Sequence, residues 1–310
     1  MRFKLLPWLA VSTLVAGLAG CQTAMAPAGA AKSSTPPIES IGLSLTCPTS
    51  RSAVPNADYI GPYMGVENIV PLKEVAQDVY CSDTFKARNF PLGFVTIYGS
   101  SRIREKNVPC DARGENCNEA VKVANDVIYR DTRNFAYAWT QRHGKKYPIM
   151  TGAGPGLMEA GNKGAVEAGG ASVGYTTYYD RKAGSDPAKP YGGDPKPALN
   201  AYVTHGLIFS SVAVRESAMI KHSAAMVIAP GGTGTEWELF QIIETIKSRQ
   251  LTKVPVYLLG NRQTHWRSLE ARLKDMVDRK TVNAEELSFL KYAETNDDLI
   301  RQLSADLGLN

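Results

Sequence analysis

A glycine-rich stretch near residue 231 has the residue types and spacing that suit an anionic ligand. Three glycines and two threonines follow Pro230 in close succession: Gly231, Gly232, Thr233, Gly234 and Thr235. Glycine lets the backbone approach a ligand closely. A turn that opens a helix also directs free N–H groups and the positive end of the helix dipole at one spot. The stretch therefore indicates a phosphate-binding loop.

The same stretch also fits a plain connection between a strand and a helix. In this alternative Thr235 is the helix N-cap, and Glu238, three residues later, completes a capping box. That arrangement accounts for Thr235 and Glu238 but leaves the three glycines unexplained. The stretch is not a P-loop, because no lysine follows the glycines and the G-x-x-x-x-G-K-[ST] spacing is missing.

Apolar runs around this loop predict the elements that position it. Residues 225–229 are an unbroken apolar run, typical of a parallel strand buried on both faces, and an apolar helical repeat follows the loop through residue 249. Further strands are predicted at 94–98, 147–151, 171–175, from 202 onward, and at 254–259, and helices at about 72–80, 118–143, from 157, and at 212–222, 265–278 and 297–307. This alternation predicts an α/β fold, a doubly wound, Rossmann-like parallel sheet flanked by helices.

Two more turns of small residues follow predicted strands. The first follows residues 94–98 and the second follows residues 147–151. Their candidate ligand-binding members are Gly99, Ser100, Arg102, Gly152, Gly154 and Gly156. The nearby Glu159 either faces the ligand or lies in a first helical turn, where the helix dipole favours a carboxylate. Ligands of doubly wound sheets bind beyond the C-terminal ends of the strands, so we expect both turns to meet the loop at 231–235 there.

The signature PGGxGTxxE, which spans Pro230–Glu238, resembles that of the LONELY GUY (LOG) family of nucleoside 5′-monophosphate phosphoribohydrolases. Three other features agree in order and spacing: Tyr98–Arg102 (YGSSR), Thr151–Ala160 (TGAGPGLMEA) and Arg215. The resemblance covers roughly residues 90–305. Some relatives carry a lysine decarboxylase label, but the sequence shows no arrangement that would hold pyridoxal phosphate.

The resemblance implies a homodimer that cleaves a nucleotide to free base and ribose 5-phosphate. We expect neither a metal nor a cofactor in the site. It makes Arg215 and Glu238 the catalytic pair, assigns the 5′-phosphate to the backbone of residues 231–235, and places residues 152–159 along the nucleotide. The chemistry is compatible, because a carboxylate beside the ribose stabilises an oxocarbenium-like state. A guanidinium can orient the phosphate or the ribose.

Four positions depart from the usual family pattern. They are Ala153, Glu216, Ala224 and Thr233. A catalytically silent nucleotide- or phosphate-binding protein is therefore the alternative function. A dinucleotide-dependent oxidoreductase is disfavoured, because the loop at 152 lacks the G-x-G-x-x-G spacing and no acidic residue ends the strand at 171–175.

The N-terminus has the pattern of a bacterial lipoprotein signal. Arg2 and Lys4 precede an apolar stretch, Leu5–Leu18, that is too short to remain as a membrane-spanning helix. The lipobox-like Leu-Ala-Gly-Cys ends at Cys21, which we expect to be acylated with palmitate. Gln22 after the cysteine favours the periplasmic side of the outer membrane. An ordinary signal peptide with a chance cysteine is the alternative.

These features divide the chain into a signal (1–21), a flexible tether (22–37), an N-terminal extension (38–90) and a nucleotide-binding domain (91–310). The apolar fraction of 44% is ample for a core. The formal charge of +5 falls to +3 without Arg2 and Lys4, and the basic residues are scattered, which argues against a nucleic-acid partner.

Four cysteines remain after Cys21. An even number in an exported chain suggests disulfides, although four cysteines allow three pairings. The polar loop between Cys110 and Cys117 favours a bond between these two, and Cys47–Cys81 would then close the extension. A metal site is disfavoured, because the spacings are not Cys-x-x-Cys and no histidine lies nearby.

Overall fold

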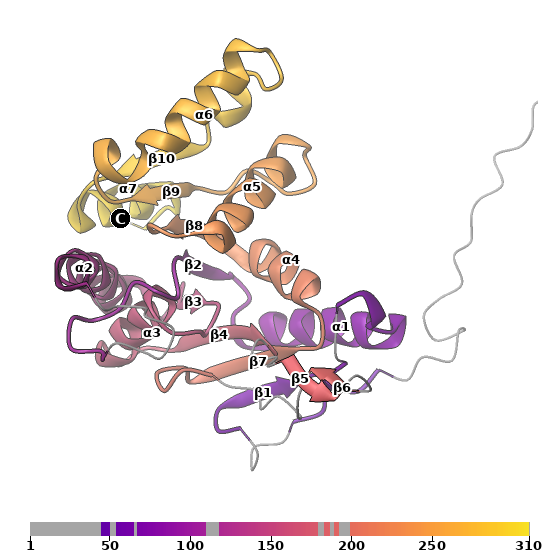
Figure 1. Ribbon diagram of the computed structural model, residues 1–310. Helices are drawn as coiled ribbons and strands as arrows, with labels where there is room; N and C mark the ends of the chain where they lie inside the picture. Colours follow the sequence, from indigo (N-terminus) through magenta and orange to yellow (C-terminus); the bar gives the residue numbers. More distant parts are fainter. Residues whose placement is uncertain are drawn as a thin grey trace, which may run out of the picture. The chain divides into compact units, whose positions relative to one another are not determined.

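An eight-stranded, all-parallel sheet is the centre of the fold (Figure 1). The computed structural model describes residues 45–49, 54–64, 67–109, 118–178, 183–186, 189–191 and 199–309. The strand order is β1-β7-β4-β3-β2-β8-β9-β10. The strands are β1 (Ala57–Ile60), β2 (Phe94–Tyr98), β3 (Ile149–Thr151), β4 (Ser172–Thr177), β7 (His205–Phe209), β8 (Ser223–Ile228), β9 (Val256–Leu259) and β10 (Leu290–Ala293).

Helices cover both faces of this sheet (Figure 1). One face carries α1 (Leu72–Asn89), α4 (Val212–His222), α5 (Thr233–Lys247) and α6 (Arg267–Asp278). The other carries α2 (Glu119–His143), α3 (Leu157–Glu167) and α7 (Asn296–Asp306). Short helical segments lie at Glu67–Ile69, Arg262–Trp266 and Ala284–Leu287. The predicted α/β, doubly wound fold is confirmed.

Two hydrophobic cores, one on each face of the sheet, explain why the strands are apolar runs in the sequence. In β2, Phe94 and Tyr98 pack toward α1, α4 and α5, whereas Val95 and Ile97 pack toward α2 and α7. All five residues of this strand are buried. Because both faces of the strand are covered, buried and exposed positions do not alternate along it. Its one polar side chain, Thr96, is also buried and shares a hydrogen bond of 2.6 Å with the Ser223 hydroxyl.

The chain reverses its direction of travel across the sheet at β2. From β2 it continues to β3 and β4 on one side, whereas β8, β9 and β10 lie on the other. The C-terminal ends of β2 and β8 are therefore neighbours at a topological switch point, which is where doubly wound sheets bind their ligands. The loop at 231–235 follows β8 directly.

The predicted start of the strand at Tyr202 and the alternative capping box at Thr235 are wrong, and a second, two-stranded sheet lies between β4 and β7 along the chain. The strand expected from Tyr202 begins at His205, because the backbone and side chain of Asn200 hold residues 200–203 in a turn. The two-stranded sheet is the antiparallel pair of β5 (Ala183–Asp186) and β6 (Lys189–Tyr191). Helix α5 begins at Thr233 with Gly232 as its N-cap, so Thr235 lies inside the helix and forms no capping box with Glu238.

Residues from the expected N-terminal extension join the main sheet. Strand β1 pairs in parallel with β7 at one edge, and α1 packs beside α4 (Figure 1). The disulfide Cys47–Cys81 ties the start of this segment to α1, with a Cα–Cα distance of 5.5 Å. The expected Cys110–Cys117 bond and the expectations for residues 1–37 lie outside the described residues.

Candidate active site

Arg215 lies in the first turns of α4 with its guanidinium inside the protein. The helix begins at Val212, where the Ser211 side chain caps the N–H of Val214. Only 3% of Arg215 is exposed. Its Nη1 donates to the carbonyl oxygen of Tyr175, at 3.1 Å, near the C-terminal end of β4. The guanidinium therefore sits at the ligand-binding edge of the sheet.

Two carboxylates face this guanidinium. Nη2 of Arg215 contacts the buried carboxylate of Glu216, and it lies 3.7 Å from Oε1 of Glu238 on α5. Burial raises the pKa of Glu238 to about 7, although Arg215 opposes the shift. Tyr98 at the end of β2 is also buried beside this pair, and burial together with Glu238 raises its pKa. A carboxyl with such a pKa can exchange a proton near neutral pH.

The glycine loop before Glu238 is open to solvent. Gly231, Gly232, Thr233 and Gly234 are exposed, whereas Thr235 is buried. A Cβ at residue 231 would lie 2.1 Å from Oγ1 of Thr235, so packing within the loop requires that glycine. A Cβ at residue 232 or 234 would meet nothing within 4 Å. The fold itself therefore does not require the last two glycines.

The turns after β2, β3 and β8 meet at this edge of the sheet. A Cβ at Gly152 would lie 2.8 Å from Nη1 of Arg215, so glycine makes room for the guanidinium. The carbonyl oxygen of Ser100 accepts from the N–H of Leu157, and the N–H of Ser100 donates to Pro230. Gly156 has φ of +72° and passes so close to Ser100 that a Cβ would lie 2.4 Å from its carbonyl oxygen.

A buried amide network, which the sequence did not suggest, supports the turn after β3. Asn162 on α3 accepts from the Thr151 hydroxyl at 2.6 Å and from the Asn200 amide at 2.8 Å. Asn200 also donates to the carbonyl oxygen of Gly154. Ala153, where the family pattern has glycine, has φ of +58° and therefore retains the left-handed backbone that glycine favours. Isolated asparagines carry no spacing signal that would reveal such a network.

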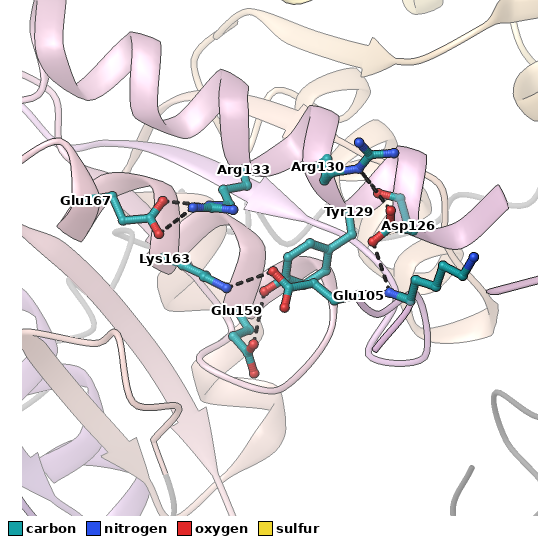
Figure 2. Close-up of polar contacts among 9 residues, drawn as sticks. Glu105, Asp126, Tyr129, Arg130, Arg133, Glu159, Lys163 and Glu167 are labelled. Carbon is teal, nitrogen blue, oxygen red and sulfur yellow. Dashed lines mark hydrogen bonds and ion pairs between the residues drawn. The ribbon is translucent and has the colours of Figure 1, made fainter. Parts of the chain in front are cut away.

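Glu159 contacts α2, and Arg102 contacts its own turn after β2. The Glu159 carboxylate accepts from the Tyr129 hydroxyl on α2, at 3.0 Å, and so links α3 to α2 (Figure 2). Beside it, Lys163 pairs with Glu105 at 2.7 Å. Arg102 is exposed, and its backbone N–H donates to the Ser100 hydroxyl. The contacts of Glu159 are therefore made with α2 and not with the Arg215–Glu238 pair.

The histidines form structural hydrogen bonds. His222 contacts the Asp83 carboxylate through Nε2 and the Tyr175 hydroxyl through Nδ1, and Nε2 of His143 contacts Ser304. Within the described ranges, no group of three or more histidine, cysteine, aspartate or glutamate side chains is placed to hold a metal ion. Tyr178, directly after β4, is buried, and its hydroxyl donates to the carbonyl oxygen of Gly61.

Residues 158–303 match a family model described as "Possible lysine decarboxylase". No curated protein matches the chain. Among solved structures, the chain is similar to a molybdenum cofactor binding protein from Rippkaea orientalis, at 14% identity and a TM-score of 0.44 over 69% of this chain and 97% of that one. It is also similar to a molybdenum cofactor carrier protein from Chlamydomonas reinhardtii, at 16% identity and a TM-score of 0.44 over 70% and 98% of the two chains.

Proposed function

This chain is a LOG-family protein, as the match over residues 158–303 supports, and from that premise we propose that it hydrolyses nucleoside 5′-monophosphates to free base and ribose 5-phosphate. The observation that carries the proposal is the approach of Arg215 and Glu238. They come from two different helices, and their side chains lie 3.7 Å apart beside an exposed glycine loop. No cofactor enters the proposed reaction.

In this proposal Glu238 acts on the ribose. As the N-glycosidic bond breaks, positive charge develops on the sugar, and an ionised carboxylate stabilises that charge. The same carboxylate can then accept a proton from the attacking water, because burial has raised its pKa to about 7. Arg215 orients the carboxylate and a ribose or phosphate oxygen, as its planar group of N–H donors permits.

The 5′-phosphate binds over residues 231–235 in this proposal. The loop opens α5, so its N–H groups and the helix dipole favour an anion. Because the phosphate lies away from the bond that breaks, its binding energy positions the anomeric carbon against Glu238.

Release of free base from AMP, CMP and GMP tests the proposal. The purified full-length chain is incubated with each nucleotide, and base and ribose 5-phosphate are separated by chromatography. We expect equal amounts of the two products from at least one nucleotide. If none yields base while nucleotides still raise the melting temperature, the hydrolase assignment is wrong and the protein is a nucleotide-binding protein without turnover.

One observation favours that second candidate function. Glu216 stands where the family commonly has lysine, and its buried carboxylate already contacts the guanidinium of Arg215. Two carboxylates then share one cation, which makes this part of the site less attractive to an anionic substrate. Glu216→Lys would restore the family pattern, and in a silent protein it would be expected to increase base release.

The phosphate assignment predicts a loss of binding without a loss of stability. Gly232→Ala and Gly234→Ala place a methyl group where the protein has open space, so we expect melting temperatures within about 2 °C of wild type. The same methyl groups obstruct a bound phosphate, so KM for the nucleotide should rise about tenfold or more. Unchanged KM in both variants would place the phosphate elsewhere.

We also propose that Cys21 anchors the protein to a membrane, on the periplasmic side of the outer membrane, and that two copies form a homodimer. None of the described helices is both long and apolar enough to cross a bilayer. If Cys21 is the anchor, palmitate labelling in cells should modify the wild-type chain and be lost in Cys21→Ser. Labelling that persists in this variant would disprove the anchor.

A further inference from the structure

The amino end of α4, the helix that carries Arg215, is held by two carboxylates from the segment between β1 and β2. These are Glu67, in the short helical segment Glu67–Ile69, and Asp78, in α1. Both precede the matched residues 158–303 and the glycine turns. No step of the proposed chemistry uses either side chain.

Asp78 is fully buried at this end of α4. Its Oδ2 accepts from the backbone N–H groups of Ser210 and Ser211, at 2.9 and 3.0 Å. Its Oδ1 accepts from the Ser210 hydroxyl at 3.3 Å and from the Tyr59 hydroxyl at 2.5 Å. The carboxylate thereby joins β1 and α1 to the two residues that precede the helix.

Glu67 takes the next N–H groups along the chain. Its Oε2 accepts from the N–H of Val212 at 2.8 Å, and its Oε1 accepts from that of Ala213 at 3.2 Å and from the Ser211 hydroxyl. The Ser211 hydroxyl accepts in turn from the N–H of Val214. Every backbone N–H from residue 210 to residue 214 therefore donates to a side chain.

We propose that Glu67 and Asp78 are positioning residues for Arg215. This inference rests on the proposed function, in which Arg215 and Glu238 act together. Two negative charges at the positive end of the helix dipole favour this arrangement of α4. The four backbone N–H groups that donate to these carboxylates fix the helix along and around its axis. Arg215 follows Val214 directly, so a shift of this helix end changes its distance of 3.7 Å to Glu238.

The opposite end of α4 supplies a matched control. Asp83, also on α1, pairs with Lys221 at 2.6 Å and with His222 at 2.8 Å. Its side chain is 41% exposed, so this contact contributes less to holding the helix than the buried Asp78 does. Asp83→Asn removes a carboxylate between the same two helices, but about two turns away from Arg215.

The test uses Asp78→Asn and Glu67→Gln, with Asp83→Asn as the control. An amide has the size of a carboxylate, but one of the two acceptor oxygens is replaced by an NH2 donor. The backbone N–H groups that face this NH2 group then lose their acceptor. The first readout is the titration of Glu238, followed by carbon NMR of labelled glutamate and assigned with Glu238→Gln. Among the described residues, Arg215 and Tyr98 are the groups that interact electrostatically with Glu238, and Glu216 contacts the same guanidinium.

Moving Arg215 away should raise the apparent pKa of Glu238 in both variants, because Arg215 lowers it in the wild type. In base release, kcat should fall about 10- to 100-fold while KM changes little, since the phosphate loop belongs to α5. Assays are run above pH 7, where Asp78 is ionised even though burial raises its pKa to about 6. Asp83→Asn should leave both readouts near wild type.

The NMR readout separates this inference from the proposed function. If the wild type releases no base but both variants still raise the apparent pKa of Glu238, the positioning role stands and the hydrolase assignment fails. If Glu67→Gln folds and leaves the titration of Glu238 unchanged, the inference is overturned, whatever the activity. Glu67 is only partly buried, so this variant stays informative even if Asp78→Asn does not fold.

Discussion

Replacing Arg215 with alanine or Glu238 with glutamine is expected to lower kcat for base release by about 10²- to 10⁴-fold. Glutamine cannot carry the negative charge that stabilises the sugar or accept the proton of water. Alanine removes the guanidinium that lies 3.7 Å from the Glu238 carboxylate. Steady-state rates for both variants and the wild type, measured with the same nucleotide, give the effect.

The double variant distinguishes a working pair from two independent residues. If Arg215 acts through Glu238, the double variant should lose little more than the worse single variant. Arg215→Ala leaves two buried carboxylates without their cation, which destabilises the fold by about 3–5 kcal/mol, so its melting temperature must be measured first.

Glu236→Gln is the matched control for the acid. Glu236 lies on α5, two residues before Glu238, and is exposed. It pairs with Arg272 at 3.0 Å. Its variant should retain the wild-type rate. If Glu238→Gln and Arg215→Ala are as active as Glu236→Gln, the catalytic residues lie elsewhere.

The fold was predictable where a strand is buried on both faces. Residues 94–98 and the helix at 212–222 agree with the sequence expectation to the residue, because an apolar run and a helical repeat leave little ambiguity. The edge strands β1 and β10 have four residues each, and neither has an unbroken apolar run. Their pairing with β7 and β9 depends on residues far along the chain, which no local pattern encodes.

The same distinction applies to the candidate site. The glycine loop at 231–235 is visible in the sequence because glycine spacing is local. Asp78 reaches Ser210 across 132 residues, and Asn200 reaches Asn162 across 38, so nothing in the sequence marks these side chains as partners. The alternative interpretation of Thr235 and Glu238 as a capping box is wrong, because the N-cap of α5 is Gly232, three residues before Thr235.

The rate of base release is expected to rise as the pH increases through about 7. Glu238 must be ionised to stabilise the developing charge, and burial raises its pKa from 4.5 to about 7. The pH dependence of kcat/KM reports the pKa of the free enzyme. The nucleotide phosphate also titrates, near pH 6, so the wild-type profile is compared with the residual activity of Glu238→Gln, which should lack the rise at 7.

Stability should change in the opposite direction over the same range. A carboxyl with a raised pKa binds its proton more tightly in the folded state than in the unfolded state. Its contribution to stability is therefore fully present below pH 4.5 and is lost as the pH rises through about 7. The loss is on the order of 1–3 kcal/mol, and Glu238→Gln should escape it.

Thermal melts of both proteins between pH 4 and pH 8 measure that difference. Asp78 also has a raised pKa, of about 6, but it is common to both proteins and cancels in the comparison. We expect Glu238→Gln to gain stability relative to the wild type as the pH increases, while its rate stays low. A constant difference in melting temperature, together with a wild-type rate that is flat from pH 6 to pH 8, would show that Glu238 does not titrate in this range and is not the base.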